Sequence, residues 1–131
     1  MKGSYILIIW LKHDQEIEVG KLGRIFFKKG YYAYIGSALN GIEKRVERHL
    51  RKEKKIRWHI DYLLQYGEIV NVFIKESVKK EECEIAKKFT PYFLCIEKFG
   101  CSDCKCKSHL FYAEKYEDFL SIIKNSLKRF K

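Results

Sequence analysis

The sequence predicts an α+β fold in which a small, mostly antiparallel sheet is flanked by helices. The first third of the chain contains apolar runs of strand length separated by short turns. After Gly36 the apolar residues recur every three or four positions, as on one face of a helix. With 131 residues, 47% of them hydrophobic, the chain can bury one core, so we expect a single domain over residues 1–131.

Four strands are expected before Gly36. The run 5–11 is continuous and rich in β-branched residues, which is typical of a central strand. Segments 16–19, 24–27 and 31–35 follow it. Lys28-Lys29-Gly30 separates the last two segments and predicts a hairpin turn between them.

The first expected helix covers residues 40–53. Ile42, Val46 and Leu50 recur every four residues with charges between them, and Asn40 is a candidate cap. Residues 56–66 predict a second, well-buried helix.

Alternating strands and helices continue toward the end of the chain. Residues 69–74 predict a strand, and residues 79–89 a third helix with Val78, Ile85, Ala86 and Phe89 on its buried face. A strand over 93–99 and a cysteine-rich segment follow. The last expected element is an amphipathic helix over 116–130.

Composition and charge narrow the functional classes. No stretch approaches the roughly 20 apolar residues of a membrane span, and the run 5–11 is too short for a signal peptide. Membrane and secreted proteins are therefore excluded and a cytoplasmic location is expected. Five cysteines without a secretory signal indicate reduced thiols or a metal site. The many Lys and Glu against few Gln and Asn are typical of a thermophile.

The charge balance indicates a polyanionic partner. Lys and Arg number 27 against 17 Asp and Glu, a net charge of +10, and residues 40–60 hold eight Lys or Arg against three Glu. Contacts of this kind with phosphates are insensitive to base sequence. We expect a nucleic acid as partner, no nucleotide cofactor, and backbone contacts from Arg48, Lys52, Lys55 and Arg57.

Two tripeptides link the sheet region to a known superfamily. Gly3-Ser4-Tyr5 opens the first strand, and Tyr34-Ile35-Gly36 stands directly before the basic helix. With these motifs the sequence resembles the GIY-YIG nuclease superfamily, which carries Gly-Ile-Tyr and Tyr-Ile-Gly on neighbouring strands. The superfamily places an Arg on the following helix, where Arg45 stands nine residues beyond Gly36. A Glu on a later helix of these proteins holds a divalent metal.

Nearly the whole chain is similar to a narrower group, the Uri-type domain of unknown function. Segments 57–62 and 101–110 carry this likeness. In some genomes the group is fused to an endonuclease III-like repair protein, which implies a DNA-repair protein as partner. The superfamily core covers about residues 3–89, and residues 90–131 form a cysteine-rich C-terminal extension.

The chain departs from the superfamily pattern at three points. Ser4 stands where Ile is usual. The long gap between Tyr5 and Tyr34 implies an extra N-terminal hairpin. Asn125 is not an obvious equivalent of the family's late Asn, because it falls on a helix expected to be peripheral.

The resemblance implies a divalent-metal-dependent endonuclease that hydrolyses nucleic-acid phosphodiester bonds, with DNA repair or processing as its setting. It makes Tyr34 the general base, Tyr5 a neighbour that orients water or metal, and Arg45 the phosphate clamp. The chemistry is consistent, because a metal-held water can attack while a guanidinium matches phosphate oxygens. The alternative is a non-catalytic nucleic-acid-binding module on the same fold.

Helical geometry adds two histidines to the candidates. At about 100° per residue, Arg45, His49 and Lys52 lie within about 60° of one another and border the apolar stripe. Side chains there can reach a cleft beside the core. His49 and His59 are therefore candidates to orient water or the leaving group, with a buried structural imidazole as the alternative for each.

The third expected helix offers three candidate carboxylates. Glu82 falls inside its apolar arc, Glu81 at the edge and Glu84 outside. A carboxylate on an apolar face costs free energy unless it is paired or binds a metal. Glu82 is therefore the candidate ligand for Mg²⁺ or Mn²⁺.

The cysteine-rich segment has the spacing C-x₂-C-x-C-x₂-H. Four residue types that bind zinc, Cys101, Cys104, Cys106 and His109, fall within nine residues and can form a closed Zn²⁺ site. The sequence leaves two other interpretations open, a reduced loop packed against the active site and a disulfide in an oxidising thermophile. A zinc-stapled interaction domain is accordingly a third functional class.

Overall fold

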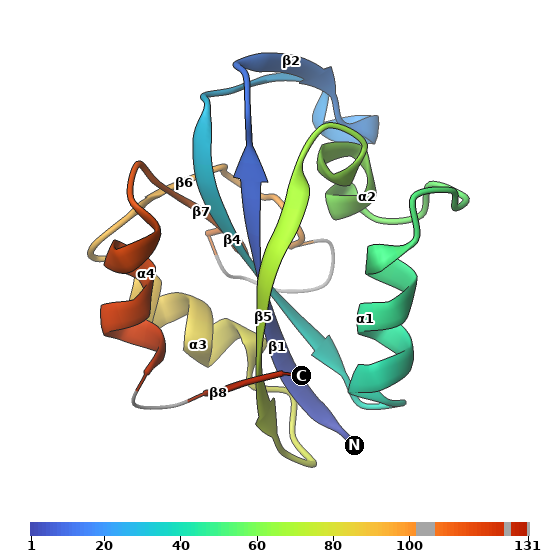
Figure 1. Ribbon diagram of the computed structural model, residues 1–131, viewed down its shortest axis with the longest axis vertical. Helices are drawn as coiled ribbons and strands as arrows, with labels where there is room; N and C mark the ends of the chain where they lie inside the picture. Colours follow the sequence, from blue (N-terminus) through green and yellow to red (C-terminus); the bar gives the residue numbers. More distant parts are fainter. Residues whose placement is uncertain (102–106, 125–126, 131) are drawn as a thin grey trace.

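A computed structural model describes residues 1–101, 107–124 and 127–130. Within these residues four helices surround a six-stranded sheet whose neighbouring strands are all antiparallel (Figure 1). The strand order is β6-β7-β4-β1-β5-β8, and the sheet does not close into a barrel. The predicted α+β class is therefore confirmed.

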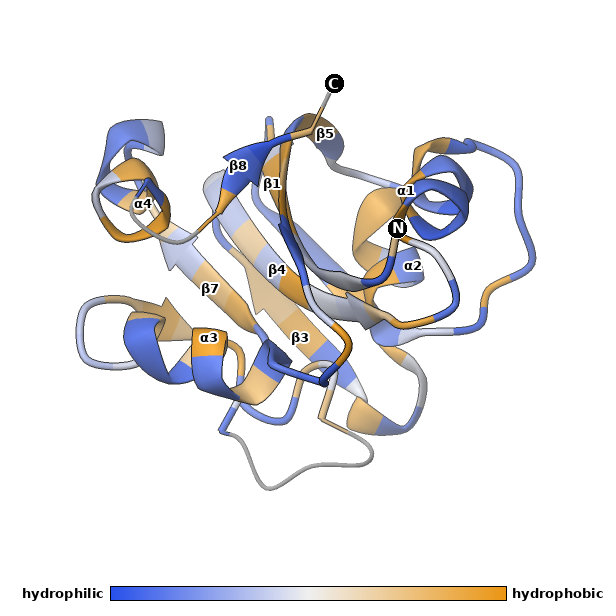
Figure 2. Ribbon diagram, turned by 90° about the horizontal axis from the view of Figure 1, so that it is seen from below, coloured by the Kyte–Doolittle hydropathy of each residue, from blue (hydrophilic) through white to orange (hydrophobic). Residues whose placement is uncertain are grey.

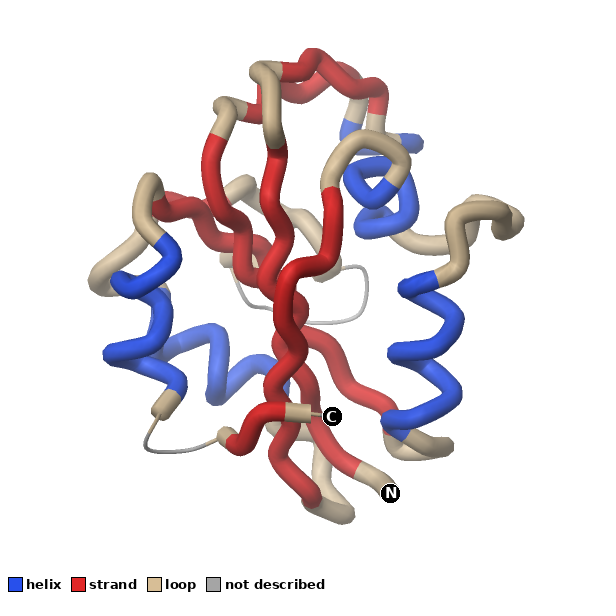
Figure 3. Tube along the Cα trace, in the orientation of Figure 1, coloured by secondary structure: helices blue, strands red, loops and turns tan. Residues whose placement is uncertain are grey.

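Three long strands form the middle of the sheet. β1 (Gly3–Leu11) pairs with β4 (Gly30–Ala38) on one side and β5 (Glu68–Glu76) on the other (Figure 3). All residues of β1 except Trp10 are buried. A strand with neighbours on both sides and helices over both faces needs apolar side chains in both directions, which explains the continuous apolar run.

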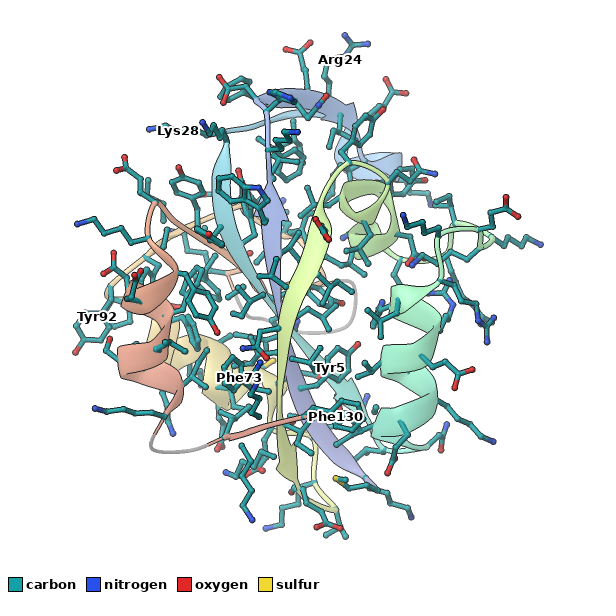
Figure 4. The ribbon with its side chains drawn as sticks, in the orientation of Figure 1. Tyr5, Arg24, Lys28, Phe73, Tyr92 and Phe130 are labelled. Carbon is teal, nitrogen blue, oxygen red and sulfur yellow. The ribbon has the colours of Figure 1, made fainter. Side chains whose placement is uncertain are left out.

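The segment between β1 and β4 is an insertion at the tip of their hairpin. It contains β2 (Gln15–Glu18), a 3₁₀ turn (Gly20–Leu22) and β3 (Arg24–Phe27). β2 and β3 pair only with each other, so the hairpin expected between 24–27 and 31–35 is wrong. The insertion supplies the extra hairpin instead, and its Arg24 and Lys28 lie at the top of Figure 4.

The sheet separates two apolar cores (Figure 2). α1 (Ile42–Leu50) and α2 (His59–Leu64) cover one face, and α3 (Glu82–Phe89) and α4 (Tyr116–Ile123) cover the other. Alternate strand residues enter alternate cores, so Tyr5 packs in the first and Phe73 in the second (Figure 4). Side chains of the α1–α2 layer and of the α3–α4 layer can therefore meet only beyond an edge of the sheet.

The helices are shorter than expected at several ends. α1 begins after Gly41 without a side-chain cap, so Asn40 is not its cap. α3 begins at Glu82, which leaves Val78 before the helix and 81% exposed rather than on its buried face. α4 ends at Ile123, and Lys128–Arg129 form β8 against β5 instead of more helix.

The last third of the chain completes the sheet. The expected strand at 93–99 is reduced to β6 (Leu94–Cys95), and the sequence did not predict β7 (Leu110–Ala113). β7 pairs with β4 from Tyr31 to Tyr34, and one more backbone hydrogen bond follows, from the N–H of Ile35 to the carbonyl of His109. Asn125 lies outside the described residues. None of the helices in the described part of the chain has the length and apolar character needed to cross a membrane.

Candidate active site

A pocket of about 540 Å³ lies where the pairing of β4 with β7 ends. Leu110 is opposite Tyr34, so the edge of β4 from Gly36 onward borders the pocket rather than β7. The two helical layers meet here, with Arg45 reaching in from α1 and Glu82 from α3. The pocket is also lined by Tyr5, Tyr34, Arg57, Trp58, His59 and Lys80.

The hydroxyl of Tyr5 is hydrogen-bonded to a buried histidine. Its Oη lies 2.7 Å from Nε2 of His49, and both side chains are almost fully buried. Burial raises the pKa of Tyr5 to about 12, although the charge of Arg45 and its hydrogen bond to the phenol oppose the rise. The Tyr5 ring also lies over Gly36 of β4, where any Cβ would overlap the ring.

Tyr34 lies beside Tyr5 with its ring centroid 6.5 Å away. It is 9% exposed, against 1% for Tyr5, and both side chains line the pocket. Burial and then the neighbouring Tyr5 and Glu82 raise the pKa of Tyr34 well above 10, and Arg45 only partly opposes them. Both phenols are therefore protonated at rest, and Arg45 lowers the pKa of Tyr5 through a hydrogen bond as well as through its charge.

His49 does not line the pocket, although it was a candidate catalytic residue. Burial lowers the pKa of His49 to about 3, so its ring is neutral. Nδ1 is buried and has no hydrogen-bond partner among the described residues. The ring therefore supports Tyr5 from the core side. With Lys52 it borders a separate depression between α1 and the end of α2.

Arg48 forms an internal ion pair rather than an exposed basic site. Its guanidinium donates two hydrogen bonds, of 3.0 and 2.9 Å, to the carboxylate of Asp61, and the Arg48 side chain is only 17% exposed. The Arg48 guanidinium is therefore not available for the contact with a nucleic-acid backbone that the sequence predicted. Lys52, Lys55 and Arg57 are exposed, and of these Arg57 lines the pocket.

Asp61 organises the start of α2. Besides Arg48, it accepts hydrogen bonds from the backbone N–H groups of Arg57 and Trp58. Burial would raise the pKa of Asp61, but these hydrogen bonds and the Arg48 charge outweigh burial and hold that pKa below its usual value. The segment that carries Arg57, Trp58 and His59 into the pocket is thereby fixed to α1.

Trp58 fixes the orientation of Arg45. The guanidinium carbons of Arg45 and Arg48 lie 4.5 and 4.2 Å from the centre of a Trp58 ring, within cation–π range. Arg45 also donates a 3.0 Å hydrogen bond to the carbonyl of Ser37 on β4. The sequence did not single out Trp58 for a role, nor Lys80. The only signal for Trp58 was its place between Arg57 and His59.

His59 lines the pocket with a defined tautomer. Its Nδ1 accepts a 2.9 Å hydrogen bond from the backbone N–H of Gly100. Burial lowers the pKa of His59, so the ring is neutral and carries its proton on Nε2. His59 can therefore donate a hydrogen bond to a ligand from Nε2, but that nitrogen is not a base.

Glu82 is the pocket carboxylate. The neighbouring Glu81 is 3.3 Å from Lys75 in an ion pair, whereas the described residues contain no such pair for Glu82. No cluster of three or more metal-binding side chains occurs in the described ranges. A single carboxylate fits Mg²⁺, which keeps several waters and often shares its sites with substrate phosphates.

The expected zinc ligands fall only partly within the described residues. Cys101 donates a weak hydrogen bond to the carbonyl of Phe99, and His109 is buried at the pocket wall. Cys104 and Cys106 lie outside the described residues. The proposed set of four ligands therefore stays a prediction.

A comparison with protein-family models matches residues 4–131 to a domain of unknown function, DUF123. The chain belongs to the DUF123 family. The matched residues include the pocket residues from both helical layers. They also include the segments that form β6, β7 and β8. Comparisons with curated proteins and with solved structures gave no match for this domain.

Proposed function

We propose that this DUF123 domain is a GIY-YIG-type endonuclease that hydrolyses nucleic-acid phosphodiester bonds with Mg²⁺ or Mn²⁺, and that its substrate is DNA. The observation that carries the proposal is the meeting of Tyr5, Tyr34, Arg45 and Glu82 in one open pocket. These residues come from two strands and two helices on opposite sides of the sheet. Packing alone does not require a phenol pair, a guanidinium and a carboxylate to share one cavity.

The charges around the pocket suit a phosphodiester. Arg45, Arg57 and Lys80 line it against the single carboxylate of Glu82. Trp58 and Ser37 hold Arg45 in place, so its remaining N–H groups can bind phosphate oxygens without first being ordered. This supports Arg45 as the phosphate clamp.

The two tyrosines can handle the proton of the attacking water. A divalent ion on Glu82 would supply an activated water and neutralise phosphate charge. Tyr5 is the better proton acceptor of the pair, because its own hydroxyl proton can pass to the neutral Nε2 of His49, 2.7 Å away, as Tyr5 takes the proton of the water, and Arg45 stabilises the phenolate character that develops. We therefore assign the base to Tyr5 and water positioning to Tyr34, the reverse of the roles expected from the motif. His59 can donate its Nε2–H toward the leaving oxygen.

A nicking assay tests this function. Supercoiled plasmid, branched DNA, damaged duplex and RNA are incubated with Mg²⁺, Mn²⁺ or EDTA. We expect metal-dependent cleavage of DNA and a loss of roughly 100-fold or more in Tyr5→Phe, Arg45→Ala and Glu82→Gln. Glu84→Gln, an exposed residue of the same helix, and Arg51→Ala, an exposed Arg after α1, are the matched controls. Full activity in the three site variants would remove the proposal.

A non-catalytic nucleic-acid-binding module is the second candidate. The raised pKa values of both tyrosines favour it, because neither phenol is ionised at neutral pH. It predicts salt-sensitive DNA binding without cleavage in any metal. The absence of measurable nucleic-acid affinity would remove both candidates.

A further inference from the structure

One edge of the central sheet is open next to β8. β8 pairs with β5 only at residues 73–74 (Figure 1), and one further hydrogen bond joins the N–H of Phe130 to the carbonyl of Val72. Among the described residues no strand pairs with the outer side of segment 68–71 of β5. Val70 in this segment is 44% exposed. The segment has the length of a short strand, and its outer side can present backbone N–H and C=O groups to a partner.

Two depressions flank this edge, one on each face of the sheet. The first has a volume of about 630 Å³, lies between α1 and the end of α2, and reaches β5 at Glu68 and Ile69. The second, of about 660 Å³, lies beside the start of α4 and reaches β5 at Val70 and Asn71. Successive side chains of a strand point to opposite faces of a sheet. A strand added to this edge would therefore place alternate side chains in the two depressions.

The first depression has apolar walls that solvent reaches. Leu50 and Tyr66 line it and are 55% and 51% exposed, although both are large apolar side chains. Leu64 and Ile69 complete the apolar wall. Exposed apolar side chains that gather beside charged ones are typical of protein interaction sites.

The charged groups of this depression are mainly cations. Arg51 and Lys52 line it and are exposed. Lys52 forms no ion pair within the described residues, and Arg51 has only a 3.9 Å contact with Glu47. Glu68 alternates with Ile69, which packs on the first core, so the Glu68 carboxylate points toward the other face. The rim therefore favours an acidic ligand.

The second depression and the net charge support the same choice. Lys115 and Arg129 line this depression and are exposed, and Glu114, one of its two carboxylates, is held in an ion pair with Lys28. The whole chain carries a net charge of +10, so two copies repel each other. An acidic partner fits this edge better than a second copy of the chain.

The open edge favours a polypeptide over a nucleic acid. Unpaired N–H and C=O groups match the donors and acceptors of an extended peptide backbone, whereas phosphate oxygens only accept. Single-stranded nucleic acids are held by aromatic platforms. The first depression has a single aromatic ring besides His49, that of Tyr66, and its other apolar side chains are aliphatic.

A bulge makes the edge selective. The register between β1 and β5 shifts between Ile8 and Ile9, which leaves Val70 as the extra residue on β5. Bulges on exposed edges deter indiscriminate pairing with other strands. The fit of side chains in the two depressions must therefore supply much of the affinity.

We propose that segment 68–71 of β5 is the docking site for an extended, acidic segment of a partner protein, which adds to this edge as a strand. An apolar side chain of that segment fills the depression at Leu50 and Tyr66, and its carboxylates pair with Arg51 and Lys52. Neither depression shares a lining residue with the candidate active site. The inference is therefore independent of the proposed nuclease activity.

Peptide selection tests the proposal without any activity assay. A phage library of random short peptides is selected on the immobilised full chain at physiological ionic strength. We expect the enriched peptides to carry Asp or Glu beside an apolar residue, with apolar residues at alternate positions and no central Pro. Lys52→Glu and Tyr66→Ala should each weaken binding of the leading peptide roughly tenfold or more in fluorescence anisotropy.

Two exposed residues of the opposite layer provide matched controls. Lys87→Glu and Tyr92→Ala should leave the peptide affinity unchanged, and circular dichroism reports the fold of all four variants. The proposal is overturned if no peptide is enriched, or if the leading peptide binds Lys52→Glu and Tyr66→Ala as tightly as the wild type.

Hydrogen exchange distinguishes strand addition from contact through side chains alone. Amide exchange within segment 68–71 should slow when the leading peptide binds, whereas exchange in β6 at the opposite edge should not change. Unchanged exchange at 68–71 would overturn strand addition. Displacement of the peptide by oligo(dT), or a dimer in light scattering that Tyr66→Ala dissociates, would assign the edge to a nucleic acid or to a second copy and overturn the proposal.

Discussion

Single residues at the pocket are fixed by neighbours that leave them little freedom. Tyr5 contacts His49 through its hydroxyl and Gly36 through its ring, and it lies within reach of the Arg45 charge. The role proposed for Tyr5 needs this kind of support, because small displacements of a reacting group cost much of its rate. Two of these contacts lead to predictions at the residue scale.

Gly36 is required by the close approach of the Tyr5 ring. A Cβ added there would overlap the ring, and both residues are on central strands that cannot move apart easily. We expect Gly36→Ala to lower the free energy of unfolding by about 1–3 kcal/mol, measured by urea denaturation. In a Tyr5→Leu background the same substitution should cost less. An equal cost in both backgrounds would show that the ring is not the cause.

His49 should make stability depend on pH. The unfolded chain protonates this ring near pH 6.5, whereas the folded chain does so only near pH 3, so the unfolded state binds more protons between these values. The free energy of unfolding should therefore fall as pH drops from 6.5 to 4, by up to about 1.4 kcal/mol per pH unit for this residue. The lowered pKa values of His59 and His109 act in the same direction.

The contribution of His49 is isolated by a variant. His49→Gln should have a shallower pH dependence over the same range than the wild type, in urea denaturation at a series of pH values. An unchanged slope would mean that His49 is not the buried neutral ring described above.

At the scale of elements, long strands and amphipathic helices could be predicted from the sequence. The ends of elements that depend on tertiary contacts could not. The run 5–11 identifies β1 because a strand buried on both faces needs continuous apolar residues. The end of α4 was missed because Lys128–Arg129 are exposed and become a strand only by pairing with β5. β7 was missed because four residues after a cysteine-rich segment carry no clear period.

The same distinction applies to the site. Tyr5, Tyr34, Arg45 and Glu82 were named from motifs and helix faces, and they meet in one pocket. The internal pairing of Arg48 with Asp61 could not be predicted, because it joins α1 to α2 through the fold.

The Arg48–Asp61 pair should hold α1 and α2 together. Asp61→Ala removes the acceptor for two guanidinium bonds and two backbone N–H groups and leaves a largely buried positive charge. We expect a loss of about 3–5 kcal/mol in the free energy of unfolding, measured by chemical denaturation. Adding Arg48→Met should restore part of it, because the unpaired charge is then gone. A double variant no more stable than Asp61→Ala would contradict this account.

At the scale of the whole molecule, the net charge of +10 is spread over several surfaces, and the fold decides which of them a nucleic acid would contact. Arg57 and Lys80 line the pocket from opposite helical layers. The β2–β3 hairpin and the residue after it also carry cations, Arg24 and Lys28, at the top of Figure 4. Arg24 is paired with Glu16 and Lys28 with Glu114. A duplex centred on the pocket would therefore contact the first group and not the second.

Salt dependence distinguishes these two surfaces. Each phosphate contact contributes about 0.9 to the slope of log affinity against log salt, so Arg57→Ala and Lys80→Ala should each weaken duplex binding and reduce the slope by about one. Arg24→Ala and Lys28→Ala should change neither the affinity nor the slope. Fluorescence anisotropy with a labelled duplex between about 50 and 200 mM salt measures both. A larger effect at the hairpin than at the pocket would place the DNA on β2 and β3 and separate binding from the proposed catalytic residues.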